Sequence, residues 1–171
     1  MAERVTFTGL RPEAVRANLD RVRERIGAAG GDPERVAICA ATKYVPVEEL
    51  PPLAEAGIEL IGENRAQDLI AKQEAHGDRF TWDFIGALQS RKVKHVAPRV
   101  RLIHSLASES ARSQLERHPA RAEDSRPYFA RLAELAAEHG LRELSMGTTQ
   151  DFEVAVAEGA TIVRLGTVLY E

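Results

Sequence analysis

A lysine and two groups of small, hydroxylated or basic residues are the features of this sequence that can do chemistry. Lys43 directly follows the apolar run 36–42, which is typical of a buried strand. At the carboxyl end of such a strand, a partly desolvated amine can lose its proton and attack an aldehyde. A lone lysine at the end of a strand is more often a solvated loop residue. Lys43 therefore indicates a reactive amine only if other segments of the chain supply the rest of a binding site.

The first partner segment follows a strand predicted at 143–146. Gly147 lets the backbone approach a ligand closely. Thr148 and Thr149 place hydroxyls beside the free N–H groups at the start of the next helix, an arrangement that binds anions. An ordinary helix N-cap formed by Thr149 or Asp151 explains the same residues, and for this segment alone the N-cap is the better interpretation.

The second partner segment is the strand predicted at 161–165, which carries an arginine in its apolar run. Arg164 is costly there unless it meets an anion or a carboxylate. Gly166 and Thr167 follow it and again offer close backbone approach and a hydroxyl. Because barrel enzymes often bind phosphate in the loops after their last two strands, the two segments together predict a phosphate site.

Hydrophobic periodicity predicts the elements that must position these residues. A helix begins near Pro12 and ends at Gly30, and strands alternate with helices after it. The remaining strands are expected at 58–61, 82–85 and 102–106, and the helices at 47–56, 66–75, 90–96, 108–116, 127–139 and 151–158. This alternation predicts an α/β fold with about six parallel strands joined by right-handed crossovers.

The chain is short for a closed barrel of this type. Eight strand–helix units need about 250 residues, and the chain has 171. Roughly two units are therefore absent by that measure. The polar segment 118–125 carries no strand and marks the expected position of the deletion, within a single domain that spans 1–171.

Composition excludes several classes of function. A net charge of −3 argues against nucleic-acid binding, and the basic stretch 91–101 has no interleaved aromatic residues. No apolar run is long enough to span a membrane, and the first residues lack a secretion signal, so we expect a cytoplasmic protein. The single cysteine, Cys39, excludes an internal disulfide and is expected to be a small core residue.

A metal site is not predicted. Glu63, Asp68, Glu74 and His76 lie close in sequence, but their spacing matches no recognised ligand pattern. We therefore expect these four residues to be surface charges.

An amine for an aldehyde and two adjacent loops for a phosphate match the two reactive ends of pyridoxal 5'-phosphate. The sequence resembles the pyridoxal phosphate homeostasis proteins, also called the YggS family. The stretches that carry the resemblance are ATKYVP at 41–46, LIGENRAQD at 60–68, FIGALQSRK at 84–92, LIHSL at 102–106, ELSMG at 143–147 and DFEVAVAEGATIVRLGT at 151–167.

The resemblance implies a fold and a set of site residues. It implies a barrel like the N-terminal domain of alanine racemase, with an extra N-terminal helix. Lys43 resembles the lysine that holds the cofactor as an internal aldimine, and Asn64 resembles the polar residue near the ring hydroxyl. The other implied cofactor-binding residues are Ser145, Gly147 and Thr149 in the first phosphate loop, Arg164, Gly166 and Thr167 in the second, and His104 at the end of the fourth strand. For His104, a structural histidine with satisfied hydrogen bonds at the strand end is at least as good an interpretation.

The sequence also departs from the family pattern. Members of the family have two further strands between LIHSL and the SRPYF helix, and this chain passes there directly from LERHPA to RAEDSRPYF. The family loop SMGMS reads SMGTT here, which keeps a hydroxyl at Thr149.

We therefore expect a non-catalytic protein that binds pyridoxal 5'-phosphate in vitamin B6 homeostasis, with cofactor-dependent apo-enzymes as possible partners. Racemase activity is not expected, because the chain has no second domain to supply a base opposite the lysine. A cofactor-free truncated barrel acting as an interaction or structural protein is the alternative, and an amino-acid racemase fragment is a weaker one. The protein is expected to be a monomer or a dimer, and an open barrel favours the dimer because it exposes sheet edges.

Overall fold

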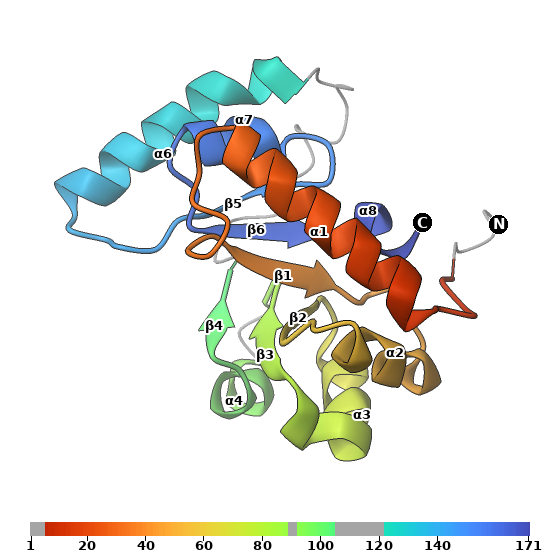
Figure 1. Cartoon of the computed structure of the whole chain (residues 1–171). Coiled ribbons are helices and arrows are strands. Elements are labelled where there is room, and N and C mark those ends of the chain that lie inside the picture. Colours follow the sequence, from red (N-terminus) through yellow and green to blue (C-terminus); the bar gives the residue numbers. More distant parts are fainter. Residues whose placement is uncertain (1–5, 89–91, 105–121) are drawn as a thin grey trace, which may run out of the picture.

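The computed structural model describes residues 6–88, 92–104 and 122–171, and these form one parallel sheet with helices around it (Figure 1). The strands are β1 (Ala37–Ala41), β2 (Leu60–Glu63), β3 (Thr81–Phe84), β4 (Leu102–Ile103), β5 (Ser145–Thr148) and β6 (Ile162–Leu165). Their order in the sheet is β4-β3-β2-β1-β6-β5, and every neighbouring pair is parallel. The predicted class, a shortened barrel of about six parallel strands, is confirmed.

The sheet curls into a half-barrel whose two outer strands are consecutive along the described chain. β4 and β5 lie at opposite ends of the strand order. In a closed barrel, strands that follow one another in sequence are neighbours, so two further strands would belong between these two. Within the described residues no strand occupies that position. The expected deletion falls partly on 118–121, outside the described residues, and 122–125 form the short helix η5 (Ala122–Ser125).

The helices lie outside the sheet. They are α1 (Pro12–Ala28), α2 (Leu50–Glu55), α3 (Ala66–His76), α4 (Val93–Val96), α6 (Arg126–Glu138), α7 (Phe152–Ala157) and α8 (Thr167–Tyr170), with the 3-10 turns η1 (Val47–Glu49), η2 (Gly77–Arg79) and η4 (Ala97–Arg99). Helix α1 packs against α2, α7 and α8. Among the described residues, no helix combines the length and apolar character needed to cross a bilayer.

Several predicted elements shift for identifiable reasons. The helix predicted at 47–56 forms as the 3-10 turn η1 followed by α2, and α2 tolerates Pro51 and Pro52 because they occupy its first turn, where a missing N–H costs nothing. The strand expected at 143–146 forms two residues later, at 145–148. Helix α8 was not expected, and the helix predicted at 108–116 lies outside the described residues.

The two faces of the sheet have different chemistry. Residues paired across parallel strands point to the same face. On the outer face, Ala40 pairs with Ile61 and Leu165, and all three are fully buried under the helices. On the inner face, Cys39 pairs with Arg164, and Gly62 pairs with Asp83. The inner face is therefore unusually polar for a barrel interior.

Candidate functional site

The loops that follow the strands meet at one edge of the sheet, as the carboxyl ends of parallel strands must. The loop after β1 lies beside the loop after β6, because a Cβ on Gly166 would be 3.9 Å from the Cβ of Ala41. It also lies beside β2, since the Thr42 amide donates a 3.0 Å hydrogen bond to the Gly62 carbonyl. The predicted amine and the predicted second phosphate loop therefore lie on adjacent strands.

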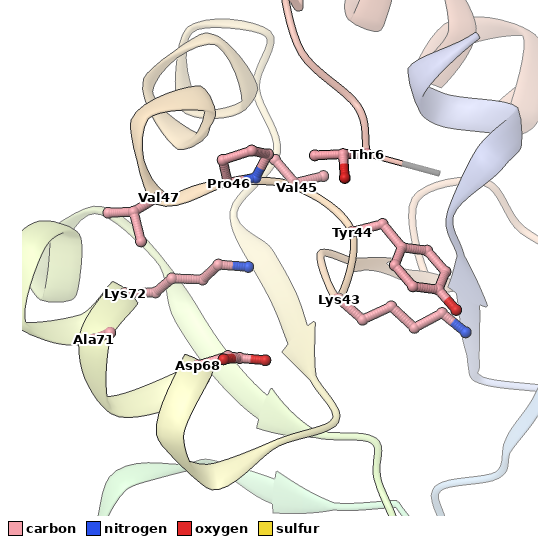
Figure 2. A pocket seen from close by; sticks show the side chains of 9 residues that line it. All are labelled: Thr6, Lys43, Tyr44, Val45, Pro46, Val47, Asp68, Ala71 and Lys72. Atoms are coloured by element: carbon pink, nitrogen blue, oxygen red, sulfur yellow. The ribbon is translucent and has the colours of Figure 1, made fainter. Parts of the chain in front are cut away.

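Lys43 lies in a turn directly after β1, closed by a 2.9 Å hydrogen bond from the Val45 amide to the Thr42 carbonyl. Its side chain is exposed, and its Nζ lies 5.0 Å from the centre of the Tyr44 ring. The partial desolvation expected for this amine is therefore not observed. Figure 2 shows the side chain extending away from Lys72 and Asp68, with which it lines a pocket of about 260 Å³.

The turn that carries Lys43 is held on several sides by hydrogen bonds to its backbone. Tyr170 Oη donates to the Ala41 carbonyl at 3.2 Å, and burial raises the pKa of Tyr170 well above its ordinary value, so it stays a donor. Lys72 Nζ donates to the Thr42 carbonyl at 2.7 Å. The Phe7 amide donates to the Tyr44 carbonyl at 2.9 Å. The backbone on both sides of Lys43 is therefore fixed.

The two predicted phosphate loops contact each other through Thr149. Its Oγ1 accepts a 3.2 Å hydrogen bond from the Gly166 amide, so the loop after β5 touches the loop after β6. Thr148 is engaged differently: its amide and hydroxyl both donate to Asp151 Oδ1, at 2.7 and 3.0 Å. Asp151 thus satisfies the donors of Thr148. It lies at the N-cap position of α7 but makes no side-chain hydrogen bond to that helix, and Thr149 remains at the loop junction.

Gly147 is required by geometry. Its φ is +89°, and a Cβ there would lie 2.6 Å from the Cβ of Ala155 and 2.9 Å from the Cα of Phe152. Close approach of the loop to α7, rather than to a ligand, therefore explains the residue. Thr167 lies at the first position of α8 and is exposed.

Two buried polar atoms in this region have no hydrogen-bond partner among the described residues. They are Arg164 Nε and Asn64 Oδ1. Burial lowers the pKa of Arg164 from its ordinary value, although nearby Asp151 acts in the opposite direction. Arg164 Nε, a buried cationic donor without a partner, fits an anionic group. Asn64 Oδ1, a buried acceptor without a partner, fits a hydroxyl donor. The residues present therefore fit the phosphate and the ring hydroxyl of the expected cofactor.

His104 and Ser145 lie together, within a network on the inner face. His104 Nε2 is 2.8 Å from Asp83 Oδ2, and Nδ1 contacts Ser145 Oγ. An ionised carboxylate only accepts, so Nε2 donates to Asp83, and Nδ1 makes the contact with Ser145. Arg101 also donates to Asp83. This network joins β3 and β4 to β5, across the side of the half-barrel that lies between its two outer strands.

The charge of Asp83 is stabilised by this network. Burial alone would raise the pKa of Asp83, but hydrogen bonds from His104 and Arg101 outweigh it and hold the pKa below its ordinary value. Because Ser145 opens β5, it lies a strand's length before Thr149. The structure thus brings together Thr149 with Gly166, and His104 with Ser145, as two separate groups.

Cys39 lies near this network but is poorly suited to bind a metal. One ligand atom each from Cys39, Asp83 and His104 lie within 4.8 Å of one another. Burial, with a further contribution from Asp83, raises the pKa of the thiol to about 12. Asp83 already accepts hydrogen bonds from Arg101 and His104, so its negative charge already has partners. The expectation that Cys39 is a small core residue agrees with its complete burial.

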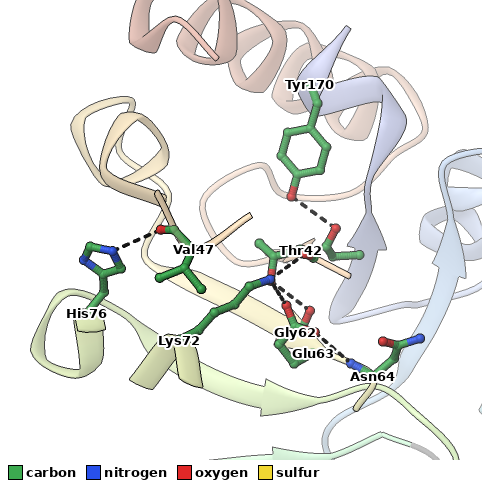
Figure 3. A network of polar contacts seen from close by, with 9 residues as sticks. Thr42, Val47, Gly62, Glu63, Asn64, Lys72, His76 and Tyr170 are labelled. Carbon is green, nitrogen blue, oxygen red and sulfur yellow. Dashed lines mark hydrogen bonds and ion pairs between the residues drawn. The ribbon is translucent and has the colours of Figure 1, made fainter. Parts of the chain in front are cut away.

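The sequence did not reveal the buried ion pair beneath the Lys43 turn (Figure 3). Glu63 was expected to be a surface charge, but it is fully buried and pairs with Lys72. Glu63 is the last residue of β2, two residues beyond the predicted end of that strand at 61, and therefore lies in the core instead of in a surface loop. The spacing of Ala66, Leu69 and Lys72 places that lysine on the buried face of α3 and was the available signal.

Comparison with known proteins identifies the relatives of this chain. No family model matches it. The pyridoxal phosphate homeostasis protein of Aquifex aeolicus is 30% identical over an alignment of 213 positions. The alignment covers 89% of this chain and 93% of that protein. The chain belongs to the pyridoxal phosphate homeostasis protein family. An alignment of 213 positions exceeds the 171 residues of the chain, so this member lacks residues that its relative has.

Solved structures support the assignment at the level of the fold. PipY from Synechococcus elongatus, solved with pyridoxal phosphate bound, has a TM-score of 0.74 and 26% identity, and the match covers 92% of this chain and all of PipY. A protein of unknown function from Bifidobacterium adolescentis has a TM-score of 0.75 and 25% identity, with 99% of each chain covered. The half-barrel therefore keeps the strand arrangement of this family.

Proposed function

We propose that this family member binds pyridoxal 5'-phosphate without catalysing a reaction on it, in the homeostasis of that cofactor. The observation that carries the proposal is the buried, unpaired Arg164 Nε, on the strand next to the one that precedes Lys43. A buried guanidinium donor without a partner is costly, and an anion bound beside it removes that cost. The homologue named for pyridoxal phosphate homeostasis and the PipY complex support the same ligand.

Each residue of the site has a distinct task in this proposal. When bound, pyridoxal 5'-phosphate would supply an aldehyde that an unprotonated amine can attack. Lys43 supplies that amine from its turn after β1. Arg164 binds the phosphate with the loops that meet at Thr149 and Gly166, and Asn64 accepts a hydrogen bond from the ring hydroxyl.

The absence of catalysis is part of the proposal. A racemase needs a second acid or base opposite the lysine and a cavity closed to water. Here Lys43 is exposed, and the pocket of about 260 Å³ that it lines includes none of the other proposed cofactor-binding residues. An open site suits a protein that loads and releases its ligand, and cofactor-dependent apo-enzymes are the proposed recipients.

A spectroscopic titration tests the proposal. Adding pyridoxal 5'-phosphate to the purified protein should produce a visible absorption band that shifts from that of the free aldehyde. Lys43→Ala should abolish the shift, and Lys94→Ala, an exposed lysine on α4, should leave it unchanged. A wild-type protein that gives no shifted band at saturating ligand would favour the cofactor-free alternative.

A further inference from the structure

The buried face of α3 holds both ends of the loop that carries Lys43. Lys72 Nζ donates to the Thr42 carbonyl at 2.7 Å, and His76 Nε2 lies 3.0 Å from the Val47 carbonyl. A carbonyl only accepts, so His76 is the donor. The two side chains are four residues apart and therefore lie on one face of the helix, as Figure 3 shows.

The burial of Lys72 and Glu63 as an ion pair is unfavourable for stability compared with apolar residues. Its side chain is 5% exposed, and that of its partner Glu63 is 0% exposed. A buried ion pair generally contributes less to stability than apolar residues of similar size. Glu63 Oε1 also accepts a 2.7 Å hydrogen bond from Thr42 Oγ1, so the pair grips the residue that precedes Lys43 through both its side chain and its carbonyl.

We infer that Glu63, Lys72 and His76 are positioning residues for Lys43. Lys72 fixes the start of the 42–47 loop and His76 fixes its end, while Glu63 balances the charge of Lys72 within the core. These contacts hold the backbone on both sides of Lys43 in place, so the exposed side chain reaches its ligand from one fixed point. The inference rests on the proposed function of Lys43.

The test neutralises Glu63 and Lys72 together, so that neither residue is left as an unpaired buried charge. In Glu63→Gln/Lys72→Met, both residues become neutral at similar volume, and the glutamine still accepts from Thr42. We expect the protein to fold, and the rate at which the pyridoxal 5'-phosphate band forms to fall about tenfold or more, since misplacement by about 1 Å can cost a hundredfold. The induced circular dichroism of that band should also weaken, because it reports how rigidly the ligand is held.

Two further sets of variants separate positioning from general destabilisation. Val22→Ala removes a fully buried methyl pair on α1, remote from the loop, and should lower stability without slowing band formation. His76→Leu should slow band formation several-fold, and His76→Gln, which keeps an N–H donor, should restore it. If the double variant fails to fold, this histidine pair decides the question alone.

The outcomes distinguish the two proposals. A wild-type protein that forms no band refutes the proposed function. In the other case, the wild-type protein forms the band, and Glu63→Gln/Lys72→Met and His76→Leu form it at the same rate and with the same circular dichroism. That result overturns the positioning role and leaves the proposed function intact.

Discussion

Replacing Lys72 by methionine should destabilise the protein far more than replacing both members of its ion pair. In Lys72→Met, the Glu63 carboxylate keeps hydrogen bonds from Thr42 Oγ1 at 2.7 Å and the Asn64 amide at 3.3 Å, but loses its only neighbouring cation among the described contacts. Breaking a buried pair in this way costs roughly 3–5 kcal/mol, and the two retained donors favour the lower end, about 3 kcal/mol.

The double variant Glu63→Gln/Lys72→Met should lose only about 1 kcal/mol, because replacing a buried pair by neutral groups is often close to neutral. Urea unfolding, followed by far-ultraviolet circular dichroism and by the fluorescence of the buried Trp82, measures both variants. As a control, Arg131→Met breaks a pair whose side chains are 58% and 64% exposed, and should change stability by less than about 0.5 kcal/mol. If Lys72→Met is as stable as the double variant, the carboxylate does not depend on Lys72 and the reasoning fails.

Three other predictions follow from the site and its surroundings. Arg164→Met should weaken the binding of pyridoxal 5'-phosphate about tenfold to a hundredfold, the range for a hydrogen bond to a charged group, and leave the binding of pyridoxal unchanged; equal losses for both ligands in parallel titrations would remove Arg164 from the phosphate site. Gly147→Ala should cost at least about 3 kcal/mol in urea unfolding, because it adds a 2.6 Å clash to an unfavourable φ of +89°. Gly159→Ala, with a φ of +96° and nothing within 4 Å, should cost about 1–2 kcal/mol, and similar values for the two would contradict the predicted clash. Asp83 has a lowered pKa in the folded protein, so it contributes stability above its unfolded pKa of about 4 that is lost as pH falls through its folded pKa. The stability of the wild type relative to Asp83→Asn should therefore be greatest near neutral pH and shrink below about pH 4, and urea midpoints that differ by a constant amount across that range would refute the role of the network.

Much of the fold could be predicted because its signals are local. The helical spacing of Val15, Leu19, Val22 and Ile26 places α1, and all four residues are buried. Apolar runs that end at Lys43 and near Arg164 place the two central strands of the site. These patterns depend on periods of two and 3.6 residues, which the sequence displays directly.

The sequence could not show which charged residues, far apart along the chain, form ion pairs and hydrogen bonds with one another. Asp83 lies in β3, Arg101 and His104 flank β4, and Ser145 lies in β5, and only the curl of the sheet brings them together. Glu63 and Lys72 are separated by the turn between β2 and α3, and their burial depends on how that helix packs. The predicted strand 143–146 also lies two residues before the observed β5, because Leu144 extends the apolar run ahead of the strand.

The location of the covalent adduct tests the central claim most directly. The chain has four lysines, Lys43, Lys72, Lys92 and Lys94, so incubation with pyridoxal 5'-phosphate, reduction with borohydride and peptide mass spectrometry can assign the adduct to one of them. We predict a single stoichiometric adduct on Lys43 at low ligand excess. An adduct spread over Lys92 and Lys94, or none at saturating ligand, would contradict the account.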